Sequence, residues 1–253
     1  MNVRKLLYVA DTNMCELLPR VVEKLISLKQ RGLDEIVFYH TVSTEHRVPE
    51  FTDLSVKTKF IVANSISGEN VLHVTKEEDP SLVVVHVDKS ESKKYATLIK
   101  RLMMESSVPL LFMNGITEEN LPRTSIFERI IFATDWSTPS VKAFEYILGL
   151  KELIEVLEIV HVIHEKLTVR SMRNMMHRIA ETRKGCLDAG IDAESHIYAG
   201  QTAEEIIRAS QDYRATLIVI GAKPPKSQWK ELFRPHTTVE VTNVATVPIL
   251  IIP

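Results

Sequence analysis

The stretch IIFATD at residues 130–135 is a continuous apolar run that ends in an aspartate, and LLYVAD at residues 6–11 opens the chain in the same way. The same marks follow in both halves: a strand-like run ending in histidine, a glycine before an amphipathic stretch, another apolar run, and a closing Val-Pro segment. A repeat of this length predicts two copies of one domain rather than a solenoid. The marks are IVFYH (36–40), Gly68, LVVV (82–85) and VPLLF (108–112), then EIVH (158–161), Gly200, LIVI (217–220) and VPILII (247–252).

We therefore predict two domains, at residues 1–116 and 126–253, in this chain of 253 residues. Each copy is long enough to bury a core of its own. Glycine, asparagine, proline and charged residues cluster between Gly115 and Ser125, as is typical of a linker. In the first copy, an irregular stretch at residues 43–54 takes the place of a helix that we expect between residues 168 and 188 in the second.

The apolar runs are short and rich in valine and isoleucine, like parallel strands that are buried on both faces. Helical periods separate them, so we predict right-handed βαβ units and a doubly wound α/β sheet in each domain. Thr202 and Glu205 have the spacing of a capping box that opens one helix. Residues 237–244 are weak helix formers, so tertiary packing must hold that last helix. The longest helical period has its apolar positions at Met172, Met175, Met176, Ile179, Cys186 and Leu187.

Composition excludes several classes of protein. With 45% hydrophobic and 25% charged residues, the chain is ordinary globular protein, and its formal net charge of −2 predicts neither a nucleic-acid partner nor a membrane surface. Two cysteines at unmatched positions argue against a disulfide framework and suit a reducing compartment. No secretory signal pattern and no apolar run of membrane-spanning length is present, so we expect a soluble cytoplasmic protein.

Polar and small residues stand at the ends of the predicted strands, where open parallel sheets bind their ligands. Asp135 could accept a hydrogen bond from a ligand amine or hydroxyl. Alternatively, Asp135 or Ser137 caps the following helix, and the two roles do not exclude each other. The strand-end positions are Asp11, His40 and His86 in the first half, and Asp135, His161 and Gly221 in the second.

No pattern predicts catalysis or metal binding. His161 and His164 are three residues apart, but no Cys-x-x-Cys or His-Glu-x-x-His run supplies further ligands. Neither cysteine has the signature of a nucleophile, and Ser137 and Ser140 lie outside any Gly-x-Ser-x-Gly elbow. We therefore expect no catalytic residue, no metal site and no enzymatic activity.

The run from Ile130 to Ser140, followed by VHV (160–162), Gly200, LIVIG (217–221) and VPILII (247–252), resembles the universal stress protein family. The first half resembles it more weakly. The resemblance implies five parallel strands per domain in the order 3-2-1-4-5, and domains that pair through their final strands. Pairing residues 108–112 with 247–252 would cover two apolar edges within one chain, as an internal pseudo-dimer, because an exposed apolar edge favours association.

A subset of this family binds ATP through a loop of the form Gly-x-x-Gly followed by Gly-Ser or Gly-Thr, where glycines let backbone N–H groups close on phosphates. The second half keeps Gly221, but Pro224 stands where the second glycine belongs, and Pro235-His236 replaces Gly-Ser. The first half reads HVDKS at residues 86–90, without a glycine. The resemblance therefore implies the branch of the family that does not bind ATP in the usual way.

Three functions stay open. The first is a non-catalytic cytoplasmic stress or regulatory protein without a cofactor, for which protein partners and a further homodimer are open questions. The second is an adenine-nucleotide or anion sensor in the second domain, in which basic side chains replace the lost backbone donors; a solvated basic loop is the alternative. The third is an enzyme on a related nucleotide-binding fold. The basic side chains are Lys223, Lys226, Arg234 and His236, and the candidate cofactor-binding residues are Asp135, Val162, Gly221, Lys223, His236 and Thr237.

Overall fold

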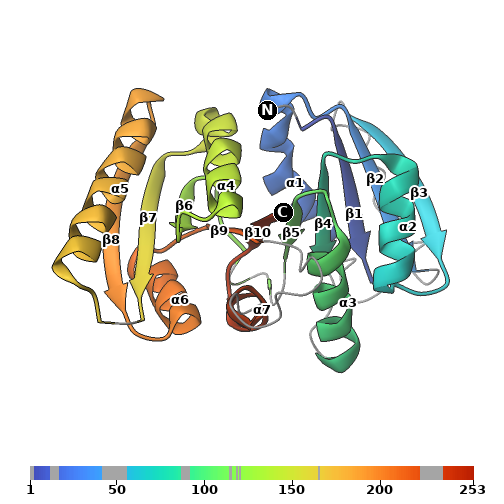
Figure 1. Cartoon of the computed structure of the whole chain (residues 1–253). Helices are drawn as coiled ribbons and strands as arrows, with labels where there is room; N and C mark the ends of the chain where they lie inside the picture. The colour runs from blue at the N-terminus through green and yellow to red at the C-terminus, as the bar shows by residue number, and fades with distance from the viewer. Residues whose placement is uncertain are drawn as a thin grey trace.

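The structure is a computed structural model that describes residues 3–11, 17–41, 56–86, 92–113, 116, 117, 119, 121–164, 166–222 and 236–253. Within these residues one ten-stranded sheet runs through the molecule in the order β3-β2-β1-β4-β5-β10-β9-β6-β7-β8 (Figure 1). Its strands are β1 (Lys5–Ala10), β2 (Glu35–Thr41), β3 (Lys57–Ala63), β4 (Leu82–His86), β5 (Leu110–Phe112), β6 (Arg129–Ala133), β7 (Val156–Ile163), β8 (Asp192–Ala199), β9 (Leu217–Gly221) and β10 (Ile249–Ile252).

Helices cover both faces of this sheet (Figure 1). Side chains from α1, α4 and α5 join the core on one face, and side chains from α2, α3, α6 and α7 join the core on the other. The helices are α1 (Leu18–Leu25), α2 (Gly68–Glu78), α3 (Ser92–Glu105), α4 (Thr138–Gly149), α5 (Val169–Asp188), α6 (Thr202–Asp212) and α7 (His236–Val244), with short 3₁₀ helices η2 (Ile26–Arg31) and η5 (Lys151–Leu153).

Each half of the sheet has the strand order that the family resemblance implied. The first half reads β3-β2-β1-β4-β5 and the second, from its own edge, reads β8-β7-β6-β9-β10. Every pair of neighbours within a half is parallel. The prediction of two doubly wound α/β units with the order 3-2-1-4-5 is therefore confirmed.

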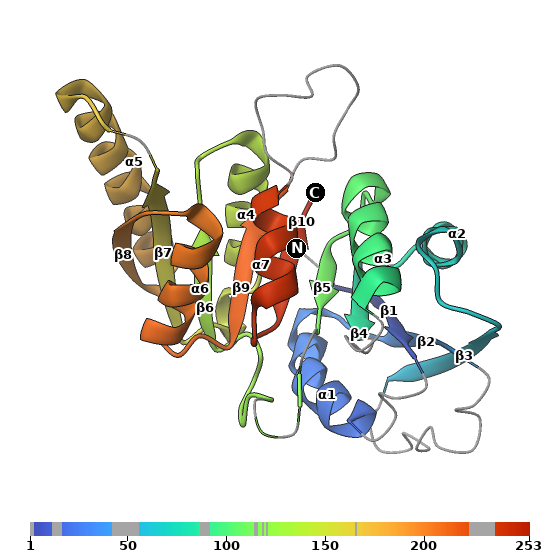
Figure 2. The same cartoon turned by 90° about the horizontal axis from the view of Figure 1, so that it is seen from below.

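The two halves meet through their final strands, as predicted for an internal pseudo-dimer. β5 and β10 pair antiparallel, with Leu111 opposite Leu250. The flanking pairs, Phe112 with Ile249 and Leu110 with Ile251, are symmetric about that central pair. A pseudo-twofold axis therefore passes between Leu111 and Leu250. Helices α3 and α7 contact each other across the same junction (Figure 2).

The hydrophobic core is shared by the two halves. One layer of buried side chains lies on each face of the sheet, and both layers contain residues from the first half and from the second. Polar contacts also cross between the halves: the guanidinium of Arg31, in η2, donates from Nε to the carbonyl oxygen of Gly149, at the end of α4, at 2.6 Å. The two domains are thus packed as one body around the β5–β10 junction.

Two local predictions need correction. The capping box of Thr202 and Glu205 is wrong, because Thr202 is already the first helical residue and Gln201, the N-cap, makes no side-chain cap. A residue inside the helix cannot cap its beginning, because an N-cap residue lies just before the first helical residue. The long helix after residue 168 is confirmed as α5, but Met172, Met176 and Leu187 are exposed, since α5 packs on the sheet along one side only. Residues 43–54 lie outside the described residues.

Candidate functional site

The repeat places equivalent residues at the strand ends of the two halves. β1 pairs with β4 from Leu6 and Leu82 onward, and β6 pairs with β9 from Ile130 and Leu217 onward. By this register, Gly221 at the end of β9 is equivalent to His86 at the end of β4. The aspartates that follow β1 and β6, and the histidines in β2 and β7, match in the same way. The two halves therefore share the aspartate and the histidine and differ at the end of the fourth strand.

Asp135 closes the turn that leads into α4. Its Oδ1 accepts a hydrogen bond from the backbone N–H of Ser137 at 2.9 Å and another from the hydroxyl of Ser140 at 2.6 Å. Partial burial of the carboxyl pushes its pKa upward, but the hydrogen bonds from Ser137 and Ser140 outweigh that effect and hold the pKa below its usual 3.8. The residue as a whole is exposed although the turn partly encloses its carboxyl, so an ionised carboxylate of fixed orientation stands at the carboxyl end of β6.

We expect Asp135→Asn to change how stability depends on pH. A carboxyl whose pKa is lowered by folding stabilises the native state above its unfolded pKa and loses that contribution as pH falls through the folded pKa. Urea unfolding should therefore show a difference between parent and variant that is constant from about pH 5 to 7 and shrinks below about pH 4. The same substitution made in a Ser140→Ala background should show a smaller pH dependence. A difference that is the same at every pH would contradict the argument.

Trp136, which the sequence reasoning did not single out, covers the ends of β6 and β7. Its backbone is left-handed, with φ of 56°, and its indole lies over the ring of His161 with centroids 4.5 Å apart. The indole Nε1 donates to the hydroxyl of Thr182 at 3.1 Å, and the guanidinium carbon of Arg178 lies 6.0 Å from the ring centroid. Both partners come from α5, so this helix is held to the strand ends through the indole.

The neighbouring His161 is oriented by the backbone. Its Nδ1 lies 2.8 Å from the carbonyl oxygen of Thr134, which can only accept, so Nδ1 carries the proton. The bond fixes the imidazole at the end of β7 with the indole of Trp136 against it. A strand-end histidine was predicted from the repeat, but its contact with the indole of Trp136 was not, since nothing in the local pattern distinguishes a covering indole from an exposed one.

Gly221 ends β9 against the beginning of α4. A Cβ at this position would lie 2.3 Å from the carbonyl carbon and oxygen of Pro139 and 2.5 Å from the nitrogen of Ser140. The next backbone N–H, that of Ala222, donates to the carbonyl oxygen of Ile252 at 2.8 Å. Close packing of strand on helix thus accounts for the glycine, and the N–H after it already has a partner.

His86 takes the equivalent place in the first half. Its side chain is fully buried, and Nδ1 lies 2.7 Å from the hydroxyl of Tyr8, which is also fully buried. Burial lowers the pKa of His86 to about 4, so the imidazole is neutral at neutral pH. Its Nε2 has no hydrogen-bond partner within the described part of the chain. The first half therefore fills this strand end with an imidazole.

The other candidate cofactor-binding residues do not all lie beside Asp135. Val162 is 8% exposed and packs in the core layer beneath α6. Thr237 is half-buried in the first turn of α7. The side chain of His236, which begins α7, lies outside the described residues, as does Lys223. The structure thus brings Asp135 and Gly221 together around the start of α4 and places the side chain of Val162 in the interior.

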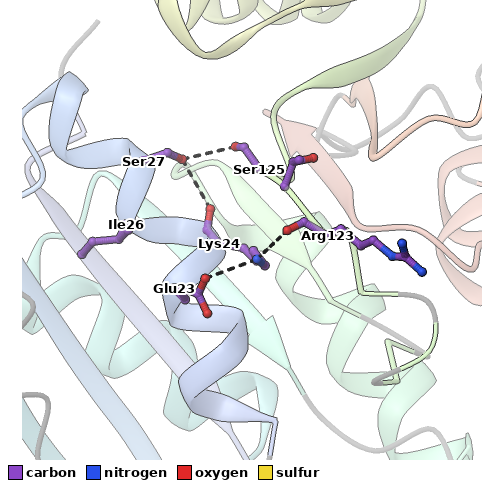
Figure 3. Close-up of a pocket in the computed structure, with 7 residues that line it drawn as sticks. Glu23, Lys24, Ile26, Ser27, Arg123 and Ser125 are labelled. Atoms are coloured by element: carbon purple, nitrogen blue, oxygen red, sulfur yellow. Dashed lines mark hydrogen bonds and ion pairs between the residues drawn. The ribbon is translucent and has the colours of Figure 1, made fainter.

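A cavity of about 340 Å³ lies between α1 with η2 and the segment that joins the two halves (Figure 3). Several of its polar groups pair with one another. The ammonium of Lys24 donates to the carbonyl oxygen of Arg123 at 2.8 Å, and the hydroxyls of Ser27 and Ser125 lie 3.3 Å apart. We interpret this cavity as part of the contact by which the linker packs against the first half.

The sequence model of the universal stress protein family matches residues 126–253. A universal stress protein from Archaeoglobus fulgidus DSM 4304 is similar in structure, with a TM-score of 0.67 and 18% identity over 97% of this chain and 95% of that one. A functionally unknown protein from Pseudomonas aeruginosa PAO1 gives 0.66 and 16% over 99% and 92%.

A shorter match is a universal stress protein from Arabidopsis thaliana with AMP bound, with a TM-score of 0.37 and 16% identity over 49% of this chain and 90% of that one. No curated protein matches the sequence. None of the helices in the described residues is both long enough and apolar enough to cross a membrane. Since the family model covers just over half of the residues, the chain belongs to the universal stress protein family.

Proposed function

We propose that this chain is a non-catalytic, cytoplasmic universal stress protein with a regulatory or protective role that does not bind ATP through a glycine loop. The observation that carries the proposal is which residues occupy the equivalent carboxyl ends of β9 and β4. One holds a glycine that is pressed against the backbone of Pro139 and Ser140, and the other holds the buried His86.

In the first half, a phosphate would have to displace an imidazole. His86 is fully buried and paired with Tyr8, and its pKa of about 4 leaves it uncharged at neutral pH. A neutral buried ring offers an anion neither space nor charge. This supports a first domain without a nucleotide.

In the second half, the backbone groups that would bind phosphate are reduced in number. The N–H of Ala222 is bonded to Ile252, and proline at positions 224 and 235 supplies no N–H at all. The glycine that remains is required by packing. These features support loss of the usual phosphate site rather than a variant of it.

The proposal is tested by thermal unfolding of the whole chain with ATP, ADP, AMP and cyclic nucleotides, each with and without Mg²⁺. A ligand that binds only the folded state at one hundred times its Kd stabilises it by about 2.7 kcal/mol, which is a readily measured shift of Tm. We expect no shift with any of them at millimolar concentration. A saturable shift with one of these nucleotides would overturn the proposal.

One observation, the orientation of Asp135, favours a second function, that of a nucleotide or anion sensor. The ionised carboxylate of Asp135 is held at a strand end in the half that kept its glycine. With Gly221, Thr237 and the basic residues Lys223 and His236, it could serve an adenine-nucleotide or anion sensor. Asp135→Ala should then abolish a nucleotide-induced shift of Tm, while Asp11→Ala should leave it unchanged. Equal effects of the two substitutions would exclude a sensor confined to the second domain.

A further inference from the structure

Two glutamates and a histidine lie together on the face of β7 and β8 that α6 covers. Glu158 of β7 and Glu194 of β8 are register partners, and His196 follows two residues along β8, on the same face. One ligand atom from each of the three side chains lies within 4.8 Å of the other two. They stand near the amino ends of their strands, at the opposite end of the sheet from Asp135.

The group contains two carboxyl side chains but only one imidazole. Glu158 is 7% exposed, and the carboxyl of Glu194 stands beside it on the next strand. Like charges directly side by side on neighbouring strands destabilise a sheet, and a buried carboxylate requires a positive partner. The Nε2 of His196 meets Oε2 of Glu158 at 2.7 Å, so one imidazole faces two carboxylates.

The imidazole is held from its far side by residues outside the group. The hydroxyl of Tyr213, directly after α6, lies 2.9 Å from Nδ1 of His196, and the two rings stack with centroids 4.2 Å apart. Tyr198 on β8 donates to Asp212 at 2.9 Å, which ties the end of α6 to the same strand. A partner on the second ring nitrogen is the usual support of a metal-binding histidine, because it fixes the tautomer and aims the first nitrogen.

We propose that Glu158, Glu194 and His196 bind a divalent transition metal, for which Zn²⁺ is the appropriate probe. One imidazole nitrogen and two carboxylate oxygens are a suitable donor set for Zn²⁺, and exposure of Glu194 leaves room for water as a fourth ligand. Mg²⁺ prefers six oxygen ligands and is disfavoured.

Binding requires the other tautomer of His196. Its Nε2 must be unprotonated to coordinate the metal, so the proton is on Nδ1, and this N–H donates a hydrogen bond to the hydroxyl oxygen of Tyr213. The hydrogen bond to Glu158 is then replaced by two bonds to the metal. The metal would connect β8, an edge strand of the sheet, to β7, and would neutralise the paired carboxylates.

Isothermal titration of the metal-stripped full-length chain with Zn²⁺ tests the proposal, with Co²⁺ absorption as a second readout of the ligand set. We expect one Zn²⁺ per chain and a rise in Tm. Glu194→Gln and His196→Gln should each weaken binding by more than about tenfold, and Tyr213→Phe by about 10- to 100-fold. Glu194 is exposed, so its variant keeps the fold, which circular dichroism verifies.

A matched control is His177→Gln, on the outer face of α5. His177 forms an exposed pair with Glu181, with Nε2 and Oε1 3.6 Å apart, and offers the same chemistry with one carboxylate fewer. Zn²⁺ binding should be unaffected by this substitution and by excess Mg²⁺. Absence of saturable binding, binding that survives His196→Gln, or binding that His177→Gln abolishes would each overturn the proposal.

Discussion

Leu250→Asp should prevent both halves of the chain from folding. The leucine is fully buried and lies opposite Leu111 at the centre of the β5–β10 junction, within a core layer that both halves share. Loss of a buried leucine to alanine alone costs about 2–5 kcal/mol. An unpaired buried carboxylate adds several kcal/mol, against a total stability of about 5–15 kcal/mol for a typical domain.

Circular dichroism and urea unfolding provide the measurement. The aspartate variant should lack a cooperative transition, whereas Leu250→Ala should unfold in one transition that is about 2–5 kcal/mol less stable than the parent. Hydrogen exchange in Leu250→Ala should quicken in β4 and in β9 together, because their cores are continuous. Val244→Asp, at a side chain that is 63% exposed, is the control and should stay folded. A first half that stays folded in Leu250→Asp would show that the domains are independent.

The repeat made the sheet predictable from the sequence. Apolar runs in a fixed order indicated parallel βαβ units, and the family resemblance then implied the strand order and the pairing of the final strands. The matching of Asp11 with Asp135, and of His40 with His161, followed from their common offset from these runs. Such features are local in sequence or are repeated, so a pattern can reveal them.

Contacts made by distant residues could not be predicted. His196 meets Glu158 across 38 residues, and its orientation depends on Tyr213, so the group exists only through the register of β7 and β8 and the end of α6. Trp136 meets Thr182 across 46 residues in the same way. Nothing in the local sequence around these residues indicates which distant segment packs against them.

The glycine at 221 shows a different limit of sequence reasoning. A glycine after a buried strand predicts a phosphate contact as readily as a tight packing contact, since both need the absence of a Cβ. Only the position of the neighbouring backbone distinguishes them. Here that neighbour is the beginning of α4, and the distinction can be tested by substitution.

Gly221→Ala should destabilise the chain by about 1–3 kcal/mol, and Gly221→Val by more, because the added atoms meet backbone that cannot rotate away. The Cβ would lie 2.3 Å from the carbonyl of Pro139, so α4 would have to shift at its first turn. That shift would draw the hydroxyl of Ser140 from Asp135, and the carboxyl pKa should rise toward its usual value.

Urea unfolding and NMR titration of the Asp135 carboxyl measure these two consequences in the same variant. Gly190→Asn is the control, since no atom beyond its chain neighbours lies within 4 Å of a Cβ there and asparagine tolerates the left-handed backbone at φ of 84°. It should change stability little and leave the carboxyl pKa where it is. If Gly221→Ala were as stable as the parent, packing would not explain the glycine, and a ligand at this strand end would become the better explanation of why this half kept it.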